Sequence, residues 1–230
     1  MYGTLYLIPC PISDETAPWD VLPAANRAVM DSLDYFIVEN TRSARRFLSK
    51  AGIARPIDTL EFRELNEHTV AGREVEELVK PLVEGRSAGV VSEAGVPGVA
   101  DPGALVVEAC HRHGIRVVPL VGPSSVILAV MASGLNGQSF AFNGYLPVKP
   151  PERVQAIRQS ERQSQLFIEA PYRNVKLMEQ LLQTLAPETR LTLAMDITAP
   201  GEYIRTLPVR EWRSVRLPEM NRRPAIFIIG

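Results

Sequence analysis

Short apolar runs alternate with amphipathic stretches along the first half of the chain. Apolar runs predict strands at residues 4–8, 35–38, 87–92 and 116–120, with a weaker strand signal at 56–60. Apolar positions at helical spacing predict helices over residues 17–30, 41–51, 70–84 and 103–113. Because strands separated by helices imply right-handed crossovers, this half is expected to form a mainly parallel sheet.

The pattern changes after residue 120. Helices are predicted at 126–133, 152–163 and 175–185, and strands at 140–142, 166–169, 191–196, 202–208 and 225–229. The last two strands are close enough in sequence to pair antiparallel, which predicts a mixed sheet. We therefore expect two α/β domains, 1–120 and 121–230, joined near residues 120–122.

Composition narrows the class of protein. The 230 residues are 46% hydrophobic and 22% charged, which suits one large or two modest globular domains. No apolar run reaches the ~18 residues of a membrane-spanning helix. Residues 1–8 have no basic leader and are expected to be a buried strand rather than a signal peptide. The chain is thus predicted to be cytoplasmic and not to associate with a membrane.

Charge and cysteine usage limit the chemistry further. The formal net charge of −1 gives no global attraction to nucleic acid, so an anionic partner must meet a local basic patch, such as Arg153, Arg158 and Arg162. Cys10 and Cys110 form no CxxC motif and no disulfide framework, so both are expected to be reduced. No metal site is predicted.

The loop at residues 92–103 is dense in glycine and proline and follows a predicted parallel strand. Such carboxyl ends are where open α/β sheets bind ligands. Residues 94–99 are expected to offer backbone to a small ligand, with Glu93 or Asp101 available for its hydroxyl or amine groups. The alternative for Asp101 is simple capping of the following helix.

Two other loops follow predicted strands of the same sheet. One contains Pro9-Cys10-Pro11-Ile12, and it lacks the GxGxxG fingerprint of a dinucleotide site. The other, Gly122-Pro123-Ser124-Ser125, opens a helix whose free amides favour an anionic or polar group. Ordinary N-capping by Ser124 is the alternative.

Charged residues near two other strand ends have competing interpretations. Arg42, Arg45 and Arg46 share one helical face, which suits either phosphate contact or a solvated basic surface. Asn40 or Thr41 can cap that helix. Glu169 follows a strand and precedes Pro171, a position where an acid more often caps or bridges than acts as a base.

Taken in order, the motifs resemble the tetrapyrrole methylase superfamily, the class III S-adenosylmethionine-dependent methyltransferases. Within it they are most similar to the ribosomal small-subunit RNA 2′-O-methyltransferase I branch. The motifs are Gly3-Thr4-Leu5-Tyr6, Pro11-Ile12, Glu39-Asn40-Thr41-Arg42, Val91-Ser92-Glu93-Ala94-Gly95-Val96-Pro97, Asp101-Pro102-Gly103, Gly122-Pro123-Ser124, Gly144-Tyr145-Leu146-Pro147 and Glu169-Ala170-Pro171-Tyr172-Arg173.

The resemblance implies two α/β domains with S-adenosylmethionine in a ligand cleft between them, and a homodimer. Carried over by motif, the residues implied to contact the cofactor are Pro11, Ile12, Ala94, Gly95, Val96, Pro97, Val99, Ser124, Ser125, Glu169, Ala170, Ala194, Met195, Pro224 and Ala225.

The branch implies methylation of a ribose 2′-hydroxyl in the RNA of the small ribosomal subunit. Glu39 and Asp14 are then the candidate general bases, and Arg42, Arg45 and Arg46 would hold phosphates. The chain departs from the branch at Asn40, Glu93, Val96 and Tyr172, where an acid, an aspartate, a threonine and a histidine are usual. Two alternatives therefore stay open: a methylase of a tetrapyrrole or other small molecule, and a non-catalytic module that binds S-adenosylmethionine or a nucleotide.

Overall fold

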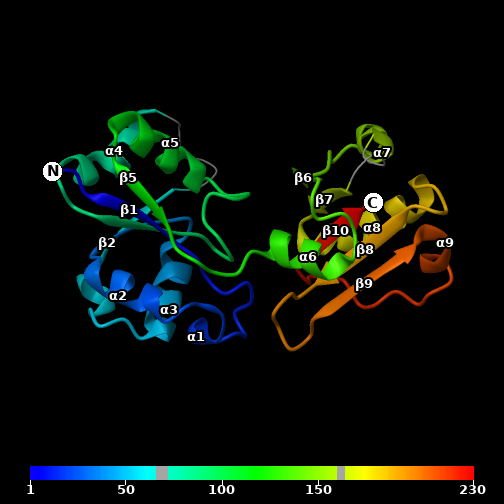
Figure 1. The fold of residues 1–230 in the computed structure, drawn as a ribbon, viewed down its shortest axis with the longest axis horizontal. Coiled ribbons are helices and arrows are strands. Elements are labelled where there is room, and N and C mark those ends of the chain that lie inside the picture. Colours follow the sequence, from blue (N-terminus) through cyan, green and yellow to red (C-terminus); the bar gives the residue numbers. More distant parts are fainter. Residues whose placement is uncertain (66–71, 160–163) are drawn as a thin grey trace. The chain divides into compact units, whose positions relative to one another are not determined.

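The chain divides into two compact units, Met1–Ser124 and Ser125–Gly230. The computed structural model describes residues 1–65, 72–159 and 164–230 (Figure 1).

The first unit is built on a five-stranded sheet in the order β3-β2-β4-β1-β5, and every neighbouring pair is parallel. The strands are β1 (Thr4–Ile8), β2 (Tyr35–Val38), β3 (Glu61–Glu64), β4 (Ala88–Val91) and β5 (Arg116–Pro119). Every residue of β2 and β4 is buried, as expected of continuous apolar strands covered on both faces. The predicted parallel sheet is confirmed.

Helices cover both faces of this sheet (Figure 1). One core cluster packs α2 (Ala25–Ser32) and α3 (Thr41–Ala51) against the sheet, and a second packs α4 (Arg73–Val83) and α5 (Gly103–His113) against the other face. Asn40 caps α3, because its Oδ1 accepts the N–H groups of Arg42 and Ser43 at 2.9 and 3.1 Å. Gly52 and Gly114 end α3 and α5 in the left-handed conformation.

Three predicted elements of this unit differ from the structure. The helix expected over 17–30 is two helices, α1 (Pro18–Val21) and α2, because Leu22 precedes a proline and is extended. The strand expected at 56–60 is wrong: Ile57–Thr59 form a single 3-10 turn, η1, and the strand begins at Glu61. The helix expected from residue 70 begins at Arg73, and residues 70–71 lie outside the described residues.

The second unit has a mixed five-stranded sheet in the order β6-β7-β10-β8-β9. The strands are β6 (Phe140–Tyr145), β7 (Ser164–Ile168), β8 (Arg190–Met195), β9 (Tyr203–Pro208) and β10 (Ala225–Ile229). Only the β6–β7 pair is parallel among these strands. The predicted mixed sheet is confirmed.

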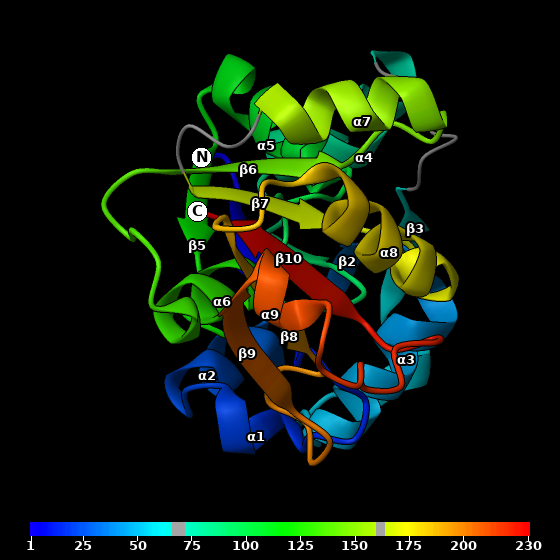
Figure 2. The same ribbon diagram turned by 90° about the vertical axis from the view of Figure 1, so that its right-hand side faces the viewer.

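The predicted pairing of the last two strands is wrong. Figure 2 shows β10 between β7 and β8, whereas β9 pairs with β8. The physical reason is burial: all five residues of β10 are buried, so this apolar strand takes a central position. The strand β9 is only partly buried and lies at the edge.

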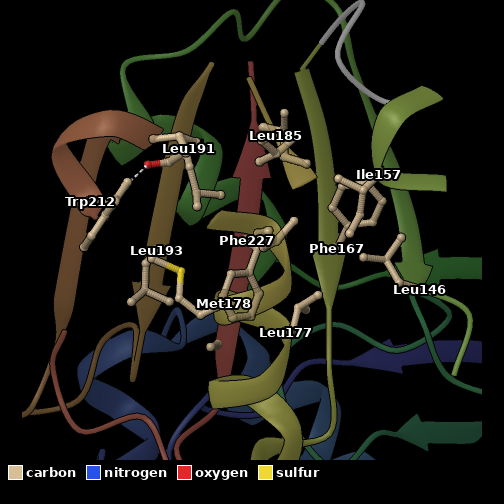
Figure 3. Close-up of a cluster of buried hydrophobic side chains, with 14 of the residues drawn as sticks. Leu146, Ile157, Phe167, Leu177, Met178, Leu185, Leu191, Leu193, Trp212 and Phe227 are labelled. Atoms are coloured by element: carbon tan, nitrogen blue, oxygen red, sulfur yellow. Dashed lines mark hydrogen bonds between the residues drawn. The ribbon is translucent and has the colours of Figure 1, made fainter. Parts of the chain in front are cut away.

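Helices α7 (Pro150–Gln159), α8 (Asn174–Thr184) and α9 (Val209–Trp212) contribute to the core of this unit (Figure 3). The Trp212 indole N–H donates to the Leu191 carbonyl at 2.8 Å, which fixes α9 to the sheet. Another helix, α6 (Ser125–Ser133), contacts β8, β9 and β10. The helix predicted at 152–163 begins earlier, at Pro150, and residues 160–163 lie outside the described residues.

Throughout the described ranges, no helix combines the length and the hydropathy needed to cross a membrane.

Candidate functional site

Three loops meet at the carboxyl edge of the parallel sheet. The loops after β1 and β4 are joined where the Cys10 N–H donates to the Gly95 carbonyl at 2.8 Å. A Cβ atom on Gly95 would lie 3.3 Å from the Pro123 carbonyl oxygen, in the loop after β5. A Cβ on Gly122 would lie 2.3 Å from Pro9 Cγ. The loops therefore approach at backbone distance, which only glycine permits at these positions.

The predicted cofactor loop after β4 combines buried turns with exposed segments. Gly95 and Gly98 have φ values of +69° and +82°. Gly95 and Pro97 are buried, Val96 is half-buried, and Ala94 and Val99 are exposed. Pro11, Ile12 and Ser124, in the two neighbouring loops, are half-buried. The structure thus brings the predicted residues of unit 1 to one sheet edge.

Asp101 holds this loop to the helix that follows it. Its Oδ1 accepts the N–H of Gly98 at 2.8 Å and the N–H of Gly103 at 2.7 Å. Pro102 occupies the N-cap position of α5. Asp101, one residue earlier, accepts the N–H of the first helical residue, which is close to the capping role that was one of its two predicted alternatives. The same oxygen also closes the loop that begins at Gly98.

Glu39 and Asp101 line a small cavity of about 10 Å³ behind the loop, together with Ser92. This volume is close to that needed for one water molecule. The Glu39 carboxylate accepts the Glu93 N–H at 3.3 Å. Burial raises the pKa of Glu39, and the hydrogen bond from the Glu93 N–H partly offsets this rise. Burial likewise raises the pKa of Asp101. Within the described residues, the buried Asp101 Oδ2 accepts no hydrogen bond.

Asp14 and the predicted phosphate-binding arginines are already engaged in ion pairs. Arg46 contacts the Asp14 carboxylate at 2.7 Å, and Arg45 pairs with Asp58. Asp14 is well exposed, its carboxylate facing Arg46. Arg42 is exposed, and its guanidinium has no partner among the described residues. Arg42 is consequently the readiest of the three to meet a phosphate.

A second group of predicted residues gathers at one edge of the mixed sheet. The antiparallel register places Ile226 opposite Ile168 and Ala225 opposite Met195. The ends of β7 and β8 and the start of β10 therefore lie together, with six predicted residues: Glu169, Ala170, Ala194, Met195, Pro224 and Ala225. The side chains of Ala194 and Met195 are buried in the core, whereas Pro224 is exposed. Ser125 begins α6 in the same unit.

Glu169 is a bridging acid rather than a free one. Its side chain is 1% exposed and lies 2.7 Å from Arg173 and 3.7 Å from Arg153. Its Oε1 also accepts the Ala170 N–H at 2.8 Å. With the carboxylate enclosed, only the main chain of this residue is left to meet a ligand.

Arg153 was expected to belong to an exposed basic patch, but it is buried. Its guanidinium donates to the carbonyls of Pro147 and Val148 and to Gln180. The sequence offered no signal for this, because the carbonyl partners are set by the folding of the preceding turn. Arg162, expected in the same patch, lies outside the described residues.

Sequence reasoning also missed an ion pair beside Pro224. Arg223 donates to the Asp196 carboxylate at 2.6 Å and to the Gly201 carbonyl at 2.6 Å. The Asn174 side chain donates to the Arg223 carbonyl at 2.6 Å. These bonds hold the turns after β8 and before β10. The sequence gives one indication of these bonds: each of the residues involved flanks the end of a strand or helix.

Neither thiol is set up as a nucleophile. Cys10 and Cys110 are free and buried. Burial raises the pKa of the Cys110 thiol to about 11, and it raises that of Cys10 further. No group of three or more metal-binding side chains occurs in the part of the chain that the structure covers.

Comparison with known proteins places this fold in a family. The model of the tetrapyrrole (corrin/porphyrin) methylases matches residues 5–212. The ribosomal RNA small subunit methyltransferase I of Vibrio cholerae is 33% identical over 227 residues, which cover 98% of this chain and 75% of that protein. The protein of the same name from Escherichia coli O157:H7 is 32% identical over 229 residues, covering 99% and 77%.

Solved structures show the same fold at lower identity. The methyltransferase CobJ aligns with a TM-score of 0.65 at 20% identity, covering 99% of this chain and 94% of CobJ. A uroporphyrin-III C-methyltransferase from Thermus thermophilus, complexed with S-adenyl homocysteine, aligns at 0.53 and 17% identity, covering 99% and 97%. The match along most of the chain and the shared two-sheet architecture lead to one conclusion: this chain belongs to the tetrapyrrole (corrin/porphyrin) methylases.

Proposed function

We propose that this protein transfers a methyl group from S-adenosylmethionine to a ribose 2′-hydroxyl in the RNA of the small ribosomal subunit. The observation that carries the proposal is the similarity to ribosomal RNA small subunit methyltransferase I, at 33% and 32% identity over nearly the whole chain. By contrast, the two solved structures described above are only 20% and 17% identical to this chain, and they support the fold alone.

The three-loop edge of unit 1 suits the cofactor. Gly95 lies where an added Cβ would approach the Pro123 carbonyl, so the loop presents main chain rather than side chains. We assign Pro11, Ile12, Ala94–Val99 and Ser124 to the cofactor from this unit. When bound, S-adenosylmethionine supplies an electrophilic methyl group on a sulfonium. The protein contributes alignment and exclusion of water, effects that are worth roughly 7–11 kcal/mol.

The mixed sheet is proposed to supply the other half of the cofactor contacts. Ser125, Ala170 and Pro224 lie at strand or helix ends, and the main chain at Glu169, Ala194, Met195 and Ala225 completes the set. The predicted cleft between the domains, 1–120 and 121–230, is part of this proposal. It requires both units to contact one cofactor molecule.

Glu39 is the better candidate for the general base. Burial raises its pKa, so its carboxylate is more basic than an exposed one and better able to take a hydroxyl proton. Asp14 is exposed, and its carboxylate is engaged in an ion pair with Arg46. We therefore assign proton removal to Glu39 and place Asp14 in the organisation of the α3 arginines.

The α3 arginines are proposed to hold the RNA backbone. Arg42 is exposed and needs no rearrangement to bind a phosphate. Arg46 must exchange its surface ion pair with Asp14 for a phosphate. Surface pairs of this kind contribute little, about 0–1 kcal/mol, so the exchange is energetically easy.

We further propose a cytoplasmic homodimer. The exposed apolar side chains of Ile127 and Met131 on α6, at 48% and 73% exposure, support an association that covers them. Because the proposed substrate is ribosomal RNA, the enzyme is expected in the compartment that contains the ribosomes.

The test is methyl transfer from radiolabelled S-adenosylmethionine to separately purified small subunits, total RNA and porphyrinoids. We expect label in the RNA of the small subunit, on a ribose whose 3′-phosphodiester then resists alkali. Label in a porphyrinoid instead would favour the small-molecule alternative. Failure of the folded protein to bind S-adenosylhomocysteine would reject the central assignment.

A second test uses the double variant Arg42→Glu with Arg46→Glu. It is expected to lose transfer to small subunits while keeping cofactor binding in calorimetry. Unchanged transfer would remove the α3 arginines from substrate binding.

A further inference from the structure

Two exposed tyrosines flank an arginine in the second unit. Tyr145 ends β6 and is 62% exposed, and Tyr172 lies just before α8 and is 67% exposed. Arg173 follows Tyr172 directly. An exposed tyrosine presents a flat apolar ring with a polar hydroxyl, which suits it to binding surfaces. We call Tyr145, Tyr172 and Arg173 the tyrosine surface.

The tyrosine surface is ordered by its own contacts. The Arg173 guanidinium lies 5.1 Å from the centre of the Tyr172 ring and donates to the Tyr172 hydroxyl at 3.1 Å. Its other nitrogens donate to the buried Glu169 carboxylate at 2.9 and 2.7 Å. The strand register places Tyr145 opposite Ile168, the residue before Glu169, so Tyr145 lies at the same end of the sheet as the Glu169–Arg173 ion pair. One aromatic plane is thus held in place without a ligand, at little entropic cost to binding.

A groove of about 350 Å³ begins at Tyr145 and runs between β6, β7 and α7. Leu146 and Phe167 form its apolar wall. Asn143 and Gln165 provide the polar part, and the Asn143 amide donates to the Gln165 carbonyl at 2.5 Å. Among the described residues, the Asn143 carbonyl and the Gln165 amide nitrogen have no other partner, so the pair offers one acceptor and one donor.

This combination matches an unpaired nucleobase. A base has a flat apolar face that stacks on aromatic rings, and an edge that carries adjacent donors and acceptors. The size of the groove falls within the range of small-molecule sites. Arg173 adds a partly exposed positive charge beside the Tyr172 ring, whereas the buried Arg153 is enclosed by its own partners.

We infer that the tyrosine surface and the adjoining groove bind single-stranded RNA, with one unstacked base in the groove and a neighbouring base against Tyr172. The inference rests on the proposed function and adds an RNA contact in the second unit, separate from the α3 arginines. It gives the enzyme a means to recognise an unpaired segment around its target ribose.

The test measures binding of a fluorescently labelled single-stranded RNA of about ten nucleotides, a length in the range of single-strand sites. Tyr145→Ala with Tyr172→Ala is expected to weaken binding at least tenfold. Gln165→Met, which keeps an unbranched side chain of similar length but removes the amide, is expected to weaken it severalfold. Tyr2→Ala removes another exposed tyrosine, at 53%, from the first unit and should leave binding unchanged.

Binding of S-adenosylhomocysteine, measured in parallel, separates loss of RNA contact from misfolding. If the wild type methylates small subunits and the tyrosine variant binds RNA as tightly as wild type, the inference fails while the proposed function stands. If the variant loses binding to intact subunits but not to naked RNA, the surface contacts ribosomal protein and the inference again fails. If the wild type binds cofactor but neither binds nor methylates RNA, the proposed function itself fails, and this inference with it.

Discussion

At the scale of single residues, the acids predicted for chemistry differ in their surroundings. Glu169 is enclosed by two arginines, Asp14 is exposed beside Arg46, and Glu39 is half-buried behind the loop after β4. All three acids lie at or near strand ends. The sequence singled out Glu169 as an acid that caps or bridges, but it did not rank Glu39 against Asp14 as the general base. The burial of Glu39 and the ion pair of Asp14 distinguish these two acids.

Replacing Glu39 by Gln separates its catalytic role from its effect on stability. Because the folded protein raises the pKa of Glu39, this group favours folding at low pH, and that contribution is lost as pH rises through the folded pKa. Glu39→Gln is therefore expected to be more stable than wild type at pH 7, with no difference near about pH 3, where the carboxyl group is protonated in both the folded and the unfolded protein. Urea denaturation at both pH values measures this.

The same variant should lose methyl transfer by roughly 10²–10⁴-fold while binding cofactor normally, as expected on removal of a general base. Glu39→Asp serves as the matched variant, since it keeps a carboxylate on a shorter side chain. A Gln variant with full activity would show that another group takes the proton.

Gly122 tests the contact between the loops after β1 and β5. Gly122→Ala would place a Cβ atom 2.3 Å from Pro9 Cγ, and a proline ring cannot move aside. We expect a loss of about 1–3 kcal/mol in the free energy of unfolding and weaker binding of S-adenosylhomocysteine. Gly137→Ala, whose Cβ would meet Val130 at an ordinary 3.6 Å, is the control. Equal stability of the two variants would contradict the close approach.

At the scale of elements, local pattern predicted most helices and strands, and failed where the signal was not local. The bounds of β1, β2, α3, α5 and β10 agree with those expected. The strand β3 was missed because Glu61–Glu64 carries three charges in four residues, which hides an edge strand. Its backbone still pairs with β2, because pairing depends on the neighbouring strand rather than on its own hydropathy.

Arg153 ties α7 to the turn before it and to the end of β7. Arg153→Met removes donors from two carbonyls and one of the two partners of the buried Glu169. We expect this to cost about 3–5 kcal/mol, the range for breaking a buried ion pair. Lys149→Met, which breaks only the exposed pair with Glu152, should cost less than about 1 kcal/mol. Thermal unfolding followed by circular dichroism compares the two, and similar losses would show that Arg153 is not structural.

At the scale of the whole molecule, each unit has its own core. One cluster of sixteen buried side chains belongs to the second unit, and two further clusters belong to the first. The proposed cofactor contacts are divided between the units. Binding is therefore expected to protect both, rather than one alone.

Hydrogen exchange with and without S-adenosylhomocysteine measures this. Amides of residues 94–96, 98 and 99 in the first unit, and of residues 170, 194–195 and 225 in the second, should exchange more slowly with ligand. At a ligand concentration of about 100 times Kd, the stabilisation is about 2.7 kcal/mol. Adenine at the same concentration is a control for binding of the base alone. Protection confined to one unit would refute the two-unit cofactor site.

The sequence by itself determined the order of elements, the parallel character of the first sheet and the loops at its carboxyl edge, because these follow from apolar periodicity and from glycine and proline. Only the tertiary structure decided which charges are free. Glu169 and Arg153 meet across 16 residues of sequence, and Arg46 meets Asp14 across 32. Burial and ion pairing arise from such distant contacts, so composition and spacing do not contain them. The central position of β10 has the same origin, since strand order is set by long-range burial rather than by closeness along the chain.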